Sequence, residues 1–177
     1  MKSKKELTNL ASISFCISIS ILFYSNSLAQ SGNLKVFQPL IGKTWVAEGN
    51  WGNGTKFKQE TTFSYDLDST IIIANSNGFI NKEQTKFGDR NHGIRKWDEE
   101  SEAIRFWEFD VFGGVTTGKI LVDGKNMRYE YQYGTTVISD FWEYIDATTY
   151  NFTIGNYEEG KWQQKYLETQ FKALNKP

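Results

Sequence analysis

Apolar and polar residues alternate along most of the chain, and turn-forming residues interrupt the alternation at short intervals. This period of two is typical of strands with one buried face, and no long stretch has helical spacing. A short lead, "SGNLKVFQPLIG", predicts one helical turn that ends near Gly42. The pattern after it predicts ten strands, over Thr44–Asn50, Lys56–Tyr65, Thr70–Phe79, Asn91–Trp97, Ala103–Val111, Val115–Val122, Met127–Tyr133, Thr136–Tyr144, Tyr150–Glu158 and Lys161–Lys172.

Short turns join most of these strands, which makes neighbours in sequence neighbours in space. Asn53-Gly54, Gly113-Gly114, Asp123-Gly124 and Glu159-Gly160 each supply a residue that tolerates the positive φ of a tight hairpin. A meander of ten strands either keeps two exposed edges or curls until its ends meet, and closure removes the edges. The sequence therefore predicts an all-β protein with one antiparallel up-and-down barrel.

The first 29 residues have the pattern of a cleaved signal peptide. Lys2, Lys4 and Lys5 precede an apolar segment, which is interrupted by serines and ends at Ser27-Leu28-Ala29. This segment is shorter than the roughly 20 apolar residues of a membrane span. We therefore expect a bacterial protein that is secreted or periplasmic, without stable membrane insertion, whose residues 30–177 form the barrel domain.

The mature chain has no thiol, because the one cysteine, Cys16, lies inside the signal, and Phe15 before it argues against lipidation. Loss of the signal leaves 17 basic and 20 acidic residues, a balance that argues against a nucleic-acid partner. The aromatic content of 16% favours a compact β protein. We expect a monomer.

The segment "PLIGKTW" after the helical lead resembles the start of lipocalins and fatty-acid-binding proteins, the calycin group, including their uncharacterised bacterial secreted members. In that group a Gly-x-Trp motif places a tryptophan across the closed end of the barrel, which is the role the resemblance implies for Trp45. Here Gly42 and Trp45 are one residue further apart, and the partner arginine near the end of the last strand is missing.

A connection over Asp98 to Glu102 would pair Trp97 with Ala103 and Arg95 with Arg105. One face of the sheet then collects Trp97, Trp107, Phe109, Ile120, Val122, Met127, Tyr129 and Tyr131, and this aromatic face should be the barrel interior. The other face collects His92, Glu108, Asp110, Lys119, Arg128 and Glu130. A slip of one residue in either loop would reverse the assignment.

The chain contains no specific catalytic or metal motif. Glu108 and Asp110 have a spacing near that of glycosidase carboxylates, but the predicted register turns both outward. His92 is the only histidine, which excludes a multi-histidine metal site. It could hold a haem as a single axial ligand, but its outward position favours a surface histidine. We therefore predict no cofactor and no catalytic residue.

The strongest candidate site is Arg95 with Arg105 on the aromatic face. Two buried guanidinium groups repel and are desolvated unless an anion joins them. Three explanations remain open: an anionic ligand binds there, Asp140 opposite Tyr129 neutralises the arginines, or both arginines lie at the barrel mouth in water.

The pattern as a whole favours a barrel that binds a small amphipathic, hydrophobic or anionic molecule. Arg95 and Arg105 would anchor its charge, Tyr129 and Tyr131 would offer hydroxyl groups, and the wall would be formed by Trp45, Trp107 and Phe109. An isomerase or hydrolase with Asp140 as general base is one alternative. An interaction module with a filled barrel and an exposed Phe106 is another.

Overall fold

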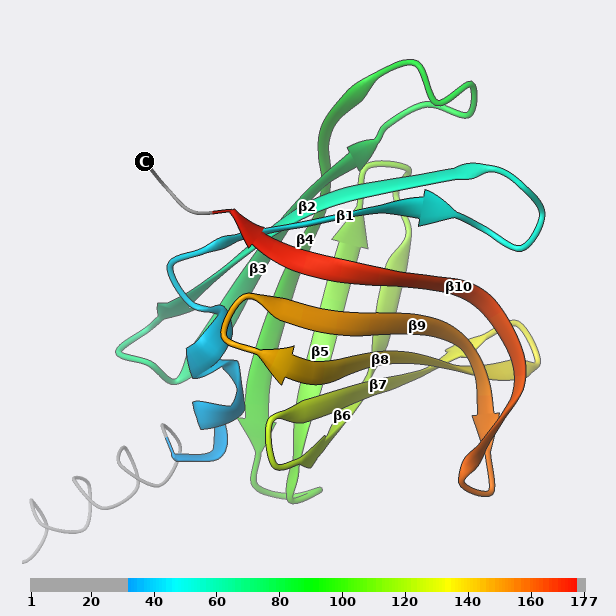
Figure 1. Cartoon of the computed structure of the whole chain (residues 1–177). Helices are drawn as coiled ribbons and strands as arrows, with labels where there is room; N and C mark the ends of the chain where they lie inside the picture. Colours follow the sequence, from blue (N-terminus) through cyan, green and yellow to red (C-terminus); the bar gives the residue numbers. More distant parts are fainter. Residues whose placement is uncertain (1–31, 175–177) are drawn as a thin grey trace, which may run out of the picture.

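The computed structural model describes residues 32–174 as a closed barrel of ten antiparallel strands (Figure 1). The predicted signal peptide lies outside the described residues. The strands are β1 (Thr44–Asn50), β2 (Lys56–Asp66), β3 (Ile71–Phe79), β4 (Phe87–Asp98), β5 (Ala103–Asp110), β6 (Val115–Asp123), β7 (Asn126–Tyr133), β8 (Thr136–Asp146), β9 (Thr149–Glu158) and β10 (Lys161–Leu174). The predicted fold class is confirmed.

Each strand pairs with its neighbours in sequence, and the first strand pairs with the last. Trp45 lies opposite Ala173 and Val46 opposite Lys172, which closes the ring between β1 and β10. Tight turns carry the chain between strands, and Gly113 and Gly124 have the positive φ angles, 85° and 60°, that such turns need. Every described strand therefore has two neighbours, although β1 and β10 pair over three residues only.

A short 3-10 helix, η1 (Lys35–Leu40), lies at one end of the barrel next to the start of β1 (Figure 1). Phe37 and Leu40 are fully buried there. The Trp45 indole Nε1 donates a hydrogen bond of 3.0 Å to the Leu40 carbonyl oxygen, and its ring lies 5.3 Å from that of Tyr150. This is the closed end of the barrel, and Trp45 occupies it as the resemblance implied.

Aromatic rings fill the half of the barrel next to the closed end. Trp142 and Phe171 are stacked at 4.3 Å between ring centroids, and Phe152 lies edge-on at 5.2 Å from Trp142 and 5.0 Å from Phe171. Burial of such rings dominates the hydrophobic stabilisation of a small core. The interior above this cluster, toward the other end, is hollow and holds the polar side chains.

The predicted register between β4 and β5 is wrong by one residue. Trp97 pairs with Ile104, Asp98 pairs with Ala103, and Arg95 lies opposite Phe106 instead of Arg105. Asp98 ends the strand instead of starting the loop, because its carboxylate accepts a hydrogen bond of 3.3 Å from the Ser101 backbone N–H. The remaining four residues make the turn, in which Glu102 has a φ of 47°.

This shift of one residue exchanges the predicted inner and outer faces of β5 alone, because side chains on a strand alternate between faces. Arg105, Trp107 and Phe109 lie on the outside, and Trp107 and Phe109 are 36% and 44% exposed. Phe106 points inward and is buried, which contradicts the exposed position expected of it. Glu108 lies on the inner face, contrary to prediction.

On β4, β6 and β7 the predicted residues point into the barrel. On the inside lie Arg95 and Trp97 of β4, Ile120 of β6, and Met127 and Tyr129 of β7, and Tyr129 pairs with Asp140 as expected. His92 is exposed on the outside, also as predicted, but its Nδ1 lies 2.7 Å from Oδ1 of Asn75 rather than beside Glu108.

Candidate ligand-binding site

The hollow half of the barrel contains a cavity of about 160 Å³. It continues into a wider mouth of about 700 Å³, which is bordered by the turns at the open end, including Lys56, Tyr133 and Thr136. Gln59, Asn91 and Thr116 line both spaces. The two spaces therefore adjoin inside the barrel.

The floor of the inner cavity is aromatic. Phe63 lies edge-on to Trp142 at 5.8 Å, and Phe152 and Phe106 also contribute to the lining. Trp45, predicted as part of the cavity wall, lies one layer deeper, where Tyr150 separates it from Trp142. Its role is to close the barrel, and it does not line the cavity.

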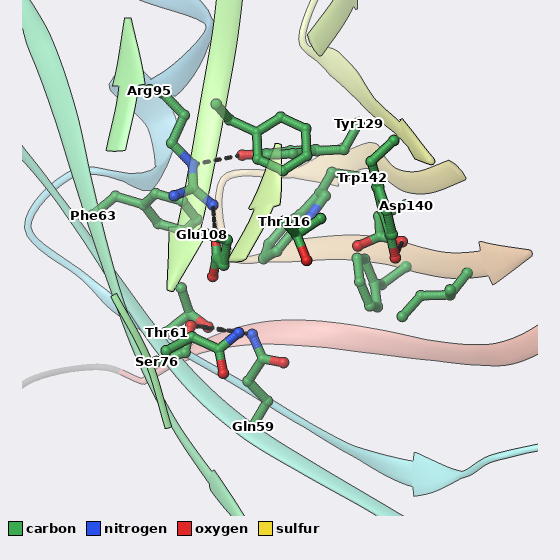
Figure 2. Close-up of a pocket in the computed structure, with 15 residues that line it drawn as sticks. Gln59, Thr61, Phe63, Ser76, Arg95, Glu108, Thr116, Tyr129, Asp140 and Trp142 are labelled. Atoms are coloured by element: carbon green, nitrogen blue, oxygen red, sulfur yellow. Dashed lines mark hydrogen bonds and ion pairs between the residues drawn. The ribbon is translucent and has the colours of Figure 1, made fainter. Parts of the chain in front are cut away.

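Arg95 is the most deeply buried charged residue of the cavity wall, with 5% of its surface exposed. Its Nη2 donates a hydrogen bond of 2.7 Å to Oε2 of Glu108, and its Nε donates one of 3.3 Å to the Tyr129 hydroxyl oxygen (Figure 2). Burial alone would lower the pKa of Arg95, but Tyr129 and Glu108 together raise it above its ordinary value. Arg95 is therefore a permanent cation whose charge is already compensated by Glu108.

Gly93 makes room for this ion pair. It lies between Asn91 and Arg95 on the inner face of β4 and pairs with Glu108 of β5. A Cβ atom at this position would collide with Nη1 of Arg95 and Oε2 of Glu108. The Arg95 side chain therefore lies back along its own strand, over the glycine and toward Asn91 and the mouth.

Asp140 and Tyr131 form a second polar pair in the cavity wall. The Tyr131 hydroxyl donates a hydrogen bond of 3.1 Å to Oδ1 of Asp140. Burial raises the pKa of Asp140 to about 7, although the hydrogen bond from Tyr131 and the charge of Arg95 oppose the shift. Near neutral pH the carboxyl group is therefore divided between its protonated and ionised forms.

The two tyrosines remain neutral hydroxyl groups at physiological pH. Burial raises the pKa of Tyr129, and burial followed by the nearby carboxyl of Asp140 raises the pKa of Tyr131. Each can therefore both donate and accept a hydrogen bond at the cavity wall.

A third polar group lies on β2 and β3, across the cavity from Asp140 (Figure 2). Nε2 of Gln59 donates a hydrogen bond of 2.8 Å to Oγ1 of Thr61, which lies 2.9 Å from Oγ of Ser76. These side chains satisfy one another and add polar wall without adding charge.

Two buried polar atoms of the cavity wall have no hydrogen-bond partner in the described part of the chain. They are Nη1 of Arg95, a donor, and Oδ1 of Asn91, an acceptor. Buried polar groups in folded proteins are almost always paired. An unpaired donor and an unpaired acceptor on one strand of a cavity wall therefore point to a partner that comes from the cavity.

Of the eight residues predicted for the site, the structure brings four together at the cavity: Arg95, Tyr129, Tyr131 and Asp140. The prediction that Arg105, Trp107 and Phe109 line it is wrong, because the slip of β5 places them on the outer face. Glu108, expected on the surface, lies at the cavity for the same reason. Gln59, Thr61 and Ser76 were not predicted, although Gln59 and Thr61 lie four and two residues before the inward-facing Phe63 and so share its face.

Among residues 32–174, no group of three or more histidine, cysteine or carboxylate side chains has the arrangement of a metal site. In the same range, no helix has the length and apolarity needed to cross a membrane.

No family model matches the chain, and no curated protein matches it. Among solved structures it is similar to the crystal structure of Rv2717c from M. tuberculosis, with a TM-score of 0.48 and 12% identity over 79% of this chain and 98% of that one. The barrel architecture described above rests on the strand pairing itself.

Proposed function

We propose that this protein is a binding barrel that takes up a small amphipathic molecule through its open mouth and holds it in the inner cavity. The apolar part of the ligand would lie on the floor formed by Phe63 and Trp142. Its polar part would meet the wall that carries Arg95 and Asp140. Concave sites with an aromatic lining and a few convergent polar groups are the usual sites of small-molecule binding.

One observation carries the proposal: a cavity that is continuous with the mouth contains a buried guanidinium with an unpaired N–H. An interior that served only as a core would be packed and its polar groups satisfied. The same observation argues against an interaction module with a filled barrel. Phe106, the aromatic residue expected to meet a partner, is 3% exposed.

The anionic ligand considered from the sequence is not part of the proposal. It depended on two arginines on the inner face, and Arg105 lies outside while Arg95 is paired with Glu108. Membership of the calycin group and export to the periplasm or cell exterior remain proposals, which the helical lead, Trp45 at the closed end and the N-terminal pattern support.

Native mass spectrometry of the exported protein tests the proposal. We expect a bound small molecule in the wild type and its loss in Thr116→Trp, which places an indole inside the space that Thr116 lines. Thr117→Trp is the matched control, because Thr117 pairs with Trp107 on the outer face and is exposed. Equal occupancy in the two variants, or no bound small molecule in the wild type, contradicts a binding function for the cavity.

Acid–base catalysis in the same cavity is a second candidate, which Asp140 favours. A carboxyl group with a pKa of about 7, held by Tyr131 at the wall of an accessible cavity, has the properties of a general base. Hydrolysis of 4-nitrophenyl acetate would follow an apparent pKa near 7 in the wild type, and Asp140→Asn would abolish this dependence. A rate equal to that of buffer alone would leave binding as the function.

A further inference from the structure

We infer that the inner cavity selects an uncharged head group that carries both a hydrogen-bond acceptor and a donor, such as a carboxamide, on a small apolar body. The inference deepens the proposed function and rests on it. It follows from the charges of the cavity wall, from the two unpaired atoms and from the size of the space above the aromatic floor.

The charged groups of the cavity wall limit the charge of the ligand. The wall contains one guanidinium, Arg95, and two carboxyl groups, Glu108 and Asp140. Glu108 already neutralises Arg95 at 2.7 Å. A carboxylate ligand would add a third acidic group to this one cation, and like charges held together in a buried site oppose ionisation. The wall therefore disfavours an anion.

A cationic head group is disfavoured for a different reason. Nη1 of Arg95 is a donor without a partner, and an ammonium group has no acceptor to offer it. Such a ligand would also lie beside a permanent positive charge. Only an acceptor atom, such as a carbonyl oxygen, satisfies the guanidinium.

The unpaired acceptor, Oδ1 of Asn91, requires a hydrogen-bond donor on the same head group. Asn91 and Arg95 lie on the same face of β4, and the Arg95 guanidinium reaches back over Gly93 toward Asn91. Nη1 and the Oδ1 of Asn91 therefore belong to one continuous stretch of wall. A carboxamide carries a carbonyl oxygen for the first and an N–H for the second.

The size of the cavity limits the body of the ligand. A cavity of about 150 Å³ with an apolar lining is large enough to bind benzene. The inner cavity here has about 160 Å³ and an aromatic floor of Phe63 and Trp142. A single ring or a short branched chain fits on this floor, and a longer tail would extend into the mouth.

Benzamide, benzoate and benzylamine test the inference, since they share one ring and differ in the charge of the head group. Calorimetric titration of the mature wild-type protein at pH 8 should give at least tenfold tighter binding for benzamide than for either charged probe. Asn91→Leu, which removes the acceptor, should weaken benzamide at least fivefold and leave toluene unchanged. Asn75→Leu is the matched control, because Asn75 is exposed on the outer face.

The outcomes separate the inference from the proposed function. Binding of benzoate or benzylamine as tight as that of benzamide overturns the inference, as does an Asn91→Leu variant with unchanged benzamide affinity. If none of the three probes binds, but a co-purifying ligand is lost in Thr116→Trp, the inference fails and the binding function stands. If neither probe nor co-purifying ligand binds, both fail.

Discussion

The guanidinium of Arg95 and the carboxylate of Glu108 form an ion pair of 2.7 Å across neighbouring strands inside the barrel. Their side chains are 6% and 19% exposed, so the pair is largely withdrawn from water. Tyr129 supports the arginine from β7, two strands beyond β5, and Gly93 provides the space in which the pair lies. This relationship fixes the charge of the cavity and hence the ligands it can accept.

Removal of one partner of this pair should be more damaging than removal of both. Arg95→Met leaves a buried carboxylate without its cation and should lower the free energy of unfolding by about 3–5 kcal/mol. Arg95→Met combined with Glu108→Met should recover most of that loss. Urea unfolding at pH 7 measures both variants, and a double variant less stable than Arg95→Met would contradict a compensated pair.

Gly93→Ala should destabilise the protein by about 1–3 kcal/mol, because the added methyl group overlaps Arg95 and Glu108 and must displace them. Gly88→Ala on the same strand is the control, since its Cβ would make an ordinary contact of 3.4 Å with Ile80. Thermal unfolding of the two variants under identical conditions provides the comparison. Equal melting temperatures would show that the ion pair does not need the glycine.

Asp140 should make the stability of the protein depend on pH. Its pKa is about 7 in the folded protein and 3.8 ordinarily, so the folded state binds this proton more tightly than the unfolded state. The free energy of unfolding should therefore fall as pH rises from about 4 to about 7 and then level off. Asp140→Asn should lack this fall, and urea unfolding at pH 5 and pH 8 tests the difference.

Trp45→Phe should weaken the closed end, because it leaves the carbonyl oxygen of Leu40 without its donor and reduces the packing against Tyr150. An unpaired buried acceptor costs about 1–3 kcal/mol. Trp107→Phe, at an exposed position on the outer face, should change stability by less than about 0.5 kcal/mol. Similar losses in the two variants, measured by chemical unfolding, would contradict the role of Trp45 as the residue that closes the barrel.

The strands and their order could be predicted from the sequence, because alternation and tight turns are local features. The two-residue turn over Gly134-Thr135 correctly paired Tyr129 with Asp140. On β6 and β7 the predicted faces are also correct, since Ile120, Met127 and Tyr129 are buried in the core.

The face of β5 could not be predicted, because a longer loop flanks this strand on each side. On one side Asp98 accepts a hydrogen bond from its own loop, and on the other the Asp110 carboxylate accepts them from the backbone N–H groups of Phe112 and Gly114. The hydrogen bonds of these carboxylates set the ends of the strand. The alternation of apolar and polar residues along the sequence does not reveal them. The cavity itself depends on side chains of eight strands, β2 to β9, so no local pattern could have revealed it.

The binding of a small molecule inside the barrel is the central claim, and ¹⁹F NMR of protein that contains 5-fluorotryptophan tests it most directly. Trp142 lines the inner cavity, whereas Trp107 lies on the outer face, and Trp→Phe variants assign the two resonances. Titration with benzamide should shift the Trp142 resonance in a saturable way and leave that of Trp107 unmoved. A saturable shift at Trp107 alone, or no shift at Trp142 under conditions in which calorimetry shows benzamide to be bound, would contradict a ligand-binding cavity in this barrel.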